Sequence, residues 1–201
     1  MTPIISPLCS RCGLPFISRA GEDHTCSECL TERRYFRKAR AFGVYKGSLM
    51  EAIHRLKYGG KTSLSRPLGA LAKHTFYQFW DANSIDLLLP VPLHIKRLRE
   101  RGFNQAYIVN KKWTGIEGIP FDGLTLSRIR WTEPQTNLAR TERRKNVTGA
   151  FFLRHPDRVK GQRVLLVDDV FTTGATANEC ARVLMKAGAE SVDVLTLARA
   201  V

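Results

Sequence analysis

The chain has 201 residues, with 32 Lys and Arg against 18 Asp and Glu, which gives a formal net charge of +14. Its length allows one domain and a small appendage. No apolar run is long enough to span a bilayer, and the first residues lack the basic flank and apolar core of a signal peptide. We therefore expect a cytoplasmic protein without stable membrane insertion, whose basic surface attracts polyanions such as nucleic acid or polyphosphate ligands.

Four of the five cysteines lie near the N-terminus as two C-x-x-C pairs, Cys9 with Cys12 and Cys26 with Cys29. Two such pairs suit tetrahedral zinc. The alternatives are two disulfides, which a reducing compartment disfavours, and a redox dithiol, which the absence of a thioredoxin-like strand before Cys9 disfavours. Since protein thiolates would fill all four positions, we expect a structural zinc in a module over residues 1–35. Removing the metal is then expected to loosen this module and to leave the melting of the main domain, residues 36–201, largely in place.

Apolar runs alternate with helix-periodic segments along the rest of the chain. Such alternation predicts an α/β fold, with a mostly parallel sheet covered by helices on both faces. In chain order, we expect a strand in 41–47, helices over 48–58 and 68–80, a strand over 85–92, a helix over 104–113, strands over 123–131 and 150–153, a strand over 163–170, a helix over 176–188 and a strand over 191–200.

The strand over 163–170 leads into the stretch VLLVDDVFTTGAT, residues 164–176. Ligands of open α/β sheets bind at the carboxyl ends of strands, which is where Asp168 and Asp169 lie. The carboxylates would accept hydrogen bonds from ribose hydroxyls, and the Thr- and Gly-rich turn before a helix suits a phosphate. A capped strand end with turn-forming threonines is the alternative. Neither G-x-x-x-x-G-K-[ST] nor G-x-G-x-x-G occurs, so a phosphoribosyl ligand fits better than a nucleoside triphosphate or a dinucleotide.

This stretch resembles the 5-phosphoribosyl 1-diphosphate signature of type I phosphoribosyltransferases, with Phe171 bulkier than the aliphatic residue usual at its position. Together with LKYGGK, LPVPLHIKRLRERGFNQA and EPQTNLARTERRKNVTGAF, it is similar to the ComF family of competence-related proteins. A four-cysteine zinc module at the N-terminus is also typical of that family.

The resemblance implies a role for each matching residue. Asp168 and Asp169 would bind the ribose hydroxyls and serve catalysis, the following loop would bind the 5′-phosphate, and residues 91–94 would lie beside the diphosphate. Magnesium would bridge the diphosphate and the ribose hydroxyls. The implied ligand-binding set is Lys57, Val91, Pro92, Arg97, Arg101, Asp168, Asp169, Val170, Thr172, Thr173, Gly174, Ala175 and Thr176.

Two basic blocks, residues 96–105 and 135–146, have no helix-period apolar face and are expected to be loop-rich lids over phosphates. The candidates in the first block are Arg97, Arg99, Arg101, Asn104 and Gln105, and those in the second are Gln135, Thr136, Arg143, Arg144 and Asn146. We favour Arg101 and Arg144 as ligand contacts over Arg99 and Lys145.

Two functions follow from the resemblance. The first is a ComF-like protein that binds 5-phosphoribosyl 1-diphosphate and handles internalised single-stranded DNA in natural transformation, with other competence proteins such as a DNA-uptake helicase as partners. The alternative is an active phosphoribosyltransferase in nucleotide salvage, although the zinc module and residues 115–131, the only candidate base sites, show no base-reading pattern. Phe36, Tyr45 and Trp131 are aromatic candidates for stacking on DNA bases, with packing inside the fold as the alternative for each.

Overall fold

The structure, a computed structural model, describes residues 1–18, 21–114, 118–132 and 140–201. The side chains of residues 112–114, 140–141 and 143–144 are not described. Of the predicted lid residues, Gln135 and Thr136 lie outside the described residues, and so do the side chains of Arg143 and Arg144.

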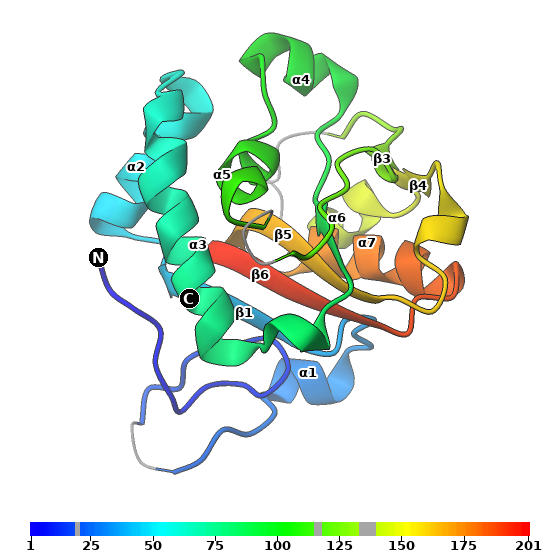
Figure 1. The fold of residues 1–201 in the computed structure, drawn as a ribbon. Coiled ribbons are helices and arrows are strands. Elements are labelled where there is room, and N and C mark those ends of the chain that lie inside the picture. Colours follow the sequence, from blue (N-terminus) through cyan, green and yellow to red (C-terminus); the bar gives the residue numbers. More distant parts are fainter. Residues whose placement is uncertain (19–20, 115–117, 133–139) are drawn as a thin grey trace.

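A four-stranded parallel sheet forms the centre of the molecule (Figure 1). In spatial order its strands are β1 (Ala39–Val44), β6 (Ser191–Arg199), β5 (Arg163–Phe171) and β2 (Leu87–Pro90). Because all four run in one direction, their carboxyl ends lie along the same edge, where ligands of such sheets bind. This confirms the predicted mostly parallel sheet.

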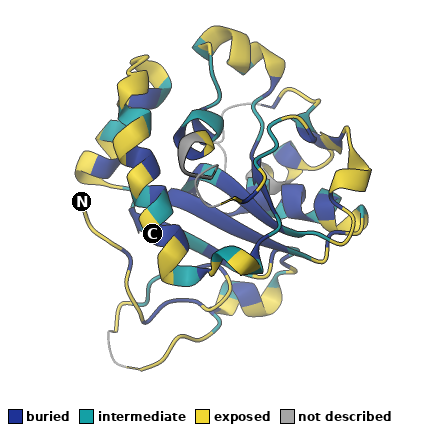
Figure 2. Ribbon diagram, viewed as in Figure 1, coloured by how far each residue is buried: buried dark blue, intermediate teal, exposed yellow. Residues whose placement is uncertain are grey.

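Helices cover both faces of the sheet, and Figure 2 shows the buried strands between them. On one face, Val164 and Leu166 of β5 share a core with α7 (Ala175–Lys186). On the other face, Leu165 and Val167 share a core with α2 (Gly47–Tyr58), α3 (Ser65–Phe79) and α5 (Gln105–Thr114). A strand buried on both sides needs apolar residues at consecutive positions, which explains the unbroken apolar run in the sequence.

The remaining elements are shorter. β3 (Leu126–Arg128) pairs antiparallel with β4 (Phe151–Leu153). α1 (Ser27–Thr31) begins directly after Cys26 and contains Cys29, and two basic helices are α4 (Ile95–Arg101) and α6 (Arg140–Val147). Within the described part of the chain, no helix is long and apolar enough to cross a membrane.

The expectation that the two basic blocks are loop-rich was wrong, because α4 and α6 are helical. α4 buries none of its residues, so it has no apolar stripe that could appear as a helical period. The residues at the two ends of α4 indicate the helix instead. The His94 ring accepts a hydrogen bond from the Lys96 amide at 3.3 Å, and Gly102 ends the helix in the left-handed conformation with φ 81°.

The N-terminal segment packs directly on the sheet. The Ile4 amide donates to the Phe42 carbonyl at 3.0 Å, and the Ala39 amide donates to the Arg11 carbonyl at 2.7 Å. The four cysteines belong to the same hydrophobic core as Phe36 and α7. Their surroundings are therefore continuous with the main core, while the domain boundary after residue 35 stays a prediction.

Candidate functional site

A cavity of about 430 Å³, here called the aspartate cleft, opens at the carboxyl edge of the sheet. β5 contributes the aspartate pair, α2 contributes Lys57, and the segment after β2 contributes Val91 and Pro92. The cleft is lined by Tyr45, His54, Lys57, Tyr58, Val91, Pro92, Leu93, Arg97, Arg101, Gln105, Arg128, Asp168, Asp169, Val170, Thr172, Thr176 and Ala200.

Lys57 and Asp169 form a buried ion pair in this cleft. Lys57 Nζ lies 2.9 Å from Asp169 Oδ1, and the two side chains are 16% and 6% exposed. Burial alone would lower the pKa of Lys57, but the Asp169 carboxylate outweighs it, so the pKa is raised. Asp169 Oδ2 is buried and has no hydrogen-bond partner within the described ranges. An unpaired carboxylate oxygen at a cleft wall can accept a hydrogen bond from a ligand hydroxyl.

Asp168 is held in a different electrostatic state. Burial raises its pKa to about 7, and the negative charge of Asp169 acts in the same direction. A hydrogen bond of 2.8 Å from the Asp169 amide to Asp168 Oδ1 only partly opposes this rise. Near neutral pH the pair can therefore gain or lose a proton when a ligand or a cation enters the cleft.

The loop between β5 and α7 is shaped for close approach to its backbone. Gly174 precedes the first residue of α7 and has φ 75°. A Cβ atom at this position would lie 2.4 Å from Cζ of Phe171, so a side chain fits neither the conformation nor the space. The first amides of α7 have no partners within the helix and lie at the positive end of its dipole. This loop can hold an anion such as a phosphate.

Three arginines also line the cleft. Arg97 and Arg101 come from α4, and Arg128 comes from β3. Burial lowers the pKa of Arg128, and the nearby charge of Arg97 adds to the effect, so an anion in the cleft would be stabilised beside them. Asn104 fixes the neighbouring segment, because its side-chain amide donates to the Val91 carbonyl at 3.0 Å.

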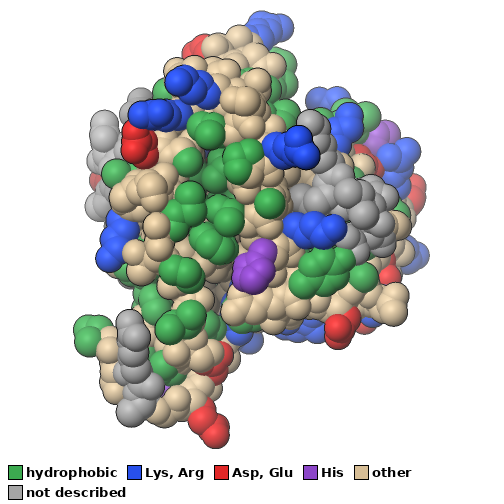
Figure 3. Space-filling model, turned by 60° about the vertical axis from the view of Figure 1, so that its left-hand side comes forward, with side chains coloured by type: hydrophobic (Ala, Val, Ile, Leu, Met, Phe, Trp, Pro, Cys, Tyr) green, Lys and Arg blue, Asp and Glu red, His purple; other side chains and the backbone are tan. Residues whose placement is uncertain are grey.

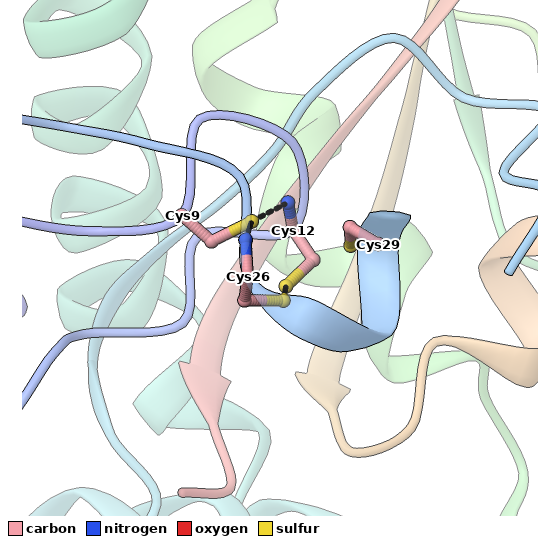
Figure 4. A group of neighbouring side chains, drawn as sticks. All are labelled: Cys9, Cys12, Cys26 and Cys29. Atoms are coloured by element: carbon pink, nitrogen blue, oxygen red, sulfur yellow. Dashed lines mark hydrogen bonds between the residues drawn. The ribbon is translucent and has the colours of Figure 1, made fainter. Parts of the chain in front are cut away.

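The four N-terminal cysteines form a compact sulfur cluster (Figure 4). Their Sγ atoms all lie within 4.8 Å of one another, and those of Cys12 and Cys26 are 3.8 Å apart. Tetrahedral Zn–S bonds of about 2.3 Å would place the sulfurs ~3.8 Å apart, so the cluster is compatible with a structural zinc. Amides of Cys12 and Cys26 donate to Cys9 Sγ at 3.4 and 3.3 Å, and such bonds help to lower the pKa of Cys9 to about 6 against the opposing effect of burial.

The chain is similar to several known proteins. The Phosphoribosyl transferase domain family matches residues 114–200. Competence protein F of Haemophilus influenzae is 32% identical over 96% of this chain and 85% of its own length. DNA utilization protein YhgH of Salmonella typhimurium is 31% identical over 96% and 84%, and competence protein ComFC of Bacillus subtilis is 28% identical over 98% and 79%. The chain belongs to the ComF family.

In this ComF-family protein, most of the predicted ligand-binding residues line one cleft. Thr173, Gly174 and Ala175 are not among the lining residues but form the adjoining turn and the start of α7. Sequence reasoning missed Tyr45 as a cleft residue, and it missed His54, Tyr58 and Arg128 altogether. Tyr45 and His54 are joined by a hydrogen bond of 2.8 Å. His54 and Tyr58 lie one turn apart on the same helix as Lys57, and this spacing could have indicated that they lie near Lys57 in the cleft.

Two arginines connect the cysteine cluster of the ComF-family chain to the loop between β5 and α7. Arg199 donates to the Cys12 carbonyl at 2.7 Å and contacts Cys12 Sγ at 3.4 Å, and its guanidinium lies 4.7 Å from the centre of the Phe171 ring. Arg34 pairs with Glu28 and donates to the Thr173 carbonyl at 3.3 Å. These contacts link the cysteine cluster to the loop between β5 and α7, and the sequence did not indicate them.

Proposed function

We propose that this protein binds 5-phosphoribosyl 1-diphosphate with Mg²⁺ in the aspartate cleft. Asp168 and Asp169 accept hydrogen bonds from the ribose hydroxyls, and the loop from Thr172 to Thr176 holds the 5′-phosphate. Residues 91–94, with Lys57 and Arg97, lie beside the diphosphate. Val170, Thr173, Gly174 and Ala175 shape the loop and the start of α7, and Arg101 adds positive charge.

The observation that carries this proposal is the buried Asp169 carboxylate beside the loop between β5 and α7, which can hold an anion. A sugar phosphate needs acceptors for its hydroxyls and donors for its phosphate within one site, and few ligands need both so close together. Asp169 Oδ2 supplies an acceptor without a present partner in the described structure, and Gly174 opens the backbone to a phosphate. Mg²⁺ suits the carboxylate and diphosphate oxygens and keeps its remaining waters.

Thermal unfolding with and without 5-phosphoribosyl 1-diphosphate and Mg²⁺ tests this binding. A ligand present at a hundred times its Kd stabilises the native state by about 2.7 kcal/mol. We expect a rise in melting temperature that neither ribose 5-phosphate nor diphosphate alone reproduces at equal concentration. Equal shifts with diphosphate alone would mean that the cations, rather than the aspartates, account for binding.

We further propose that the protein acts in DNA uptake and natural transformation, in the cytoplasm, by handling internalised single-stranded DNA. The names of its relatives, competence protein and DNA utilization protein, support this role, as does the net charge of +14. On the face drawn in Figure 3, separate Lys and Arg side chains surround an area of hydrophobic side chains in the upper half. A structural zinc on Cys9, Cys12, Cys26 and Cys29 and a competence helicase as partner belong to the same proposal.

Binding of a fluorescent single-stranded oligonucleotide over a series of salt concentrations tests the DNA role. Contacts to phosphates release counterions, so log K should fall linearly and steeply with log salt, with little dependence on base sequence. A flat salt dependence would contradict a phosphate-dominated surface. An active phosphoribosyltransferase remains the alternative, and release of diphosphate in the presence of a free base would favour it.

A further inference from the structure

A second cavity, here called the aromatic cleft, adjoins the aspartate cleft. Its volume is about 550 Å³, and it shares Lys57, Tyr58, Arg97 and Arg101 with its neighbour. An occupant of one cavity can therefore reach the other. The aromatic cleft is lined by Lys57, Tyr58, Gly60, Arg97, Glu100, Arg101 and Trp131.

Two large aromatic rings line this cleft and stay exposed to solvent. Tyr58, the last residue of α2, is 71% exposed, and Trp131, which follows β3, is 37% exposed. Neither belongs to a hydrophobic core cluster, so packing inside the fold does not explain them. Phe36 differs, because it is 1% exposed and serves the core, which removes it as a candidate for stacking on bases.

Cationic side chains accompany both rings. The Arg101 guanidinium lies 5.3 Å from the centre of the Tyr58 ring, and the Arg97 guanidinium lies 5.2 Å from that of Trp131. Lys96 is 5.6 Å from the Trp131 ring, and the His94 ring meets it edge-on at 5.4 Å. These contacts hold the indole in place before any ligand arrives, which lowers the entropy cost of stacking on it.

We propose that the aromatic cleft binds a nucleobase, stacked on Trp131 and Tyr58, with the attached or neighbouring phosphate facing the shared cations. Flat π-systems stack on exposed aromatic rings and on guanidinium planes, and phosphates pair with Lys57, Arg97 and Arg101. The base belongs either to single-stranded DNA or to a free base that meets the phosphoribosyl ligand. This inference rests on the proposed function, because the phosphoribosyl group would occupy the adjoining cleft.

Quenching of Trp131 fluorescence tests the proposal directly. The other two tryptophans, Trp80 and Trp113, are present in both proteins, so the difference between the wild type and Trp131→Phe isolates the signal of the cleft residue. The probes are a short oligothymidylate, an abasic oligonucleotide of equal length, and free adenine or uracil added with 5-phosphoribosyl 1-diphosphate and Mg²⁺. Affinities of the unlabelled variants are measured in parallel by competition against a fluorescent oligothymidylate.

We expect Trp131→Ala to bind oligothymidylate about tenfold or more weakly, as expected for loss of one stacked base, and Trp131→Phe to retain affinity but lose the quench. Binding of the abasic strand should be unchanged in both variants. Tyr77→Ala is the matched control, because Tyr77 is 49% exposed and has a lysine 5.7 Å from its ring centre but lies on α3, outside the cleft.

The probes also identify the source of the base. Quenching by oligothymidylate alone assigns the cleft to DNA, and quenching by a free base assigns it to an acceptor. The proposal would be overturned if Trp131→Ala kept wild-type affinity for oligothymidylate and no free base quenched Trp131 in the wild type. An equal loss of affinity for the abasic strand, with no quenching by a free base, would overturn it as well. Failure of the proposed function is seen separately, as no binding of 5-phosphoribosyl 1-diphosphate to the wild type, whereas Trp131→Ala should bind that ligand normally.

Discussion

Replacing Lys57 by Met should strongly destabilise the protein, because it leaves the Asp169 carboxylate buried without its cation. The N–O distance of 2.9 Å and side-chain exposures of 16% and 6% describe a pair that water screens poorly. Breaking a buried pair from one side costs about 3–5 kcal/mol. The cleft is open to solvent, so we expect the lower end of this range, ~3 kcal/mol. With a urea m-value of about 3 kcal/mol/M, the unfolding midpoint should fall by roughly 1 M.

A double-mutant cycle separates this coupling from other effects of the substitutions. In Lys57→Met/Asp169→Asn no charge is left stranded, and we expect a coupling free energy of about 2 kcal/mol or more. Arg55 and Glu51 on the same helix provide the matched control, since their side chains are 57% and 59% exposed. That pair should couple by less than ~0.5 kcal/mol. Equal coupling in the two cycles would refute the claim that the Lys57–Asp169 pair is buried and structurally coupled.

Three further predictions concern the loop, the proton and the metal. Gly174→Ala should weaken binding of 5-phosphoribosyl 1-diphosphate by about tenfold or more, because Phe171 blocks the new methyl group. Gly161→Ala is the control, because Gly161 has φ 72° and open space around it. That substitution should cost only backbone strain and leave the affinity for the ligand unchanged. In the folded state Asp168 keeps its proton between its ordinary pKa of 3.8 and about 7. The wild type should therefore lose stability relative to Asp168→Asn as pH rises through that window. Ligand affinity should increase as pH approaches and passes 7, because we expect binding to need the ionised carboxylate. Chelation or Cys26→Ser should lower one melting transition of the whole chain, as seen by calorimetry, and two separate transitions would contradict the shared core.

The central sheet was predictable because strands that are buried on both faces need consecutive apolar residues, which are visible in the sequence. The strand over 163–170 and the helix over 176–188 were predicted within two residues at either end, since Gly174 and Gly188 punctuate that helix. The N-terminal cysteines were recognisable from spacing alone. Each of these signals is local, so a single sequence carries it.

The features that escaped prediction did so for two reasons, the lack of a buried face and contacts between distant segments. α4 has no buried face, and only its caps at His94 and Gly102 indicated a helix. Arg199 lies next to Cys12 because β6 runs past the cysteine cluster, although 187 positions separate the two residues. That proximity also changes the expected response to metal removal, from loosening of an independent module to destabilisation of the whole fold.

Calorimetric titration of the zinc-loaded protein with 5-phosphoribosyl 1-diphosphate and Mg²⁺ tests the central claim most directly. Asp168→Asn is the informative variant, because it removes one carboxylate without separating Lys57 from Asp169. The exposed Asp157→Asn serves as the control. We predict binding in the micromolar range, about −8 kcal/mol, retained in the control and at least tenfold weaker in Asp168→Asn. No heat in the wild type, or equal affinity in Asp168→Asn, would contradict the assignment of the aspartate cleft to a phosphoribosyl ligand.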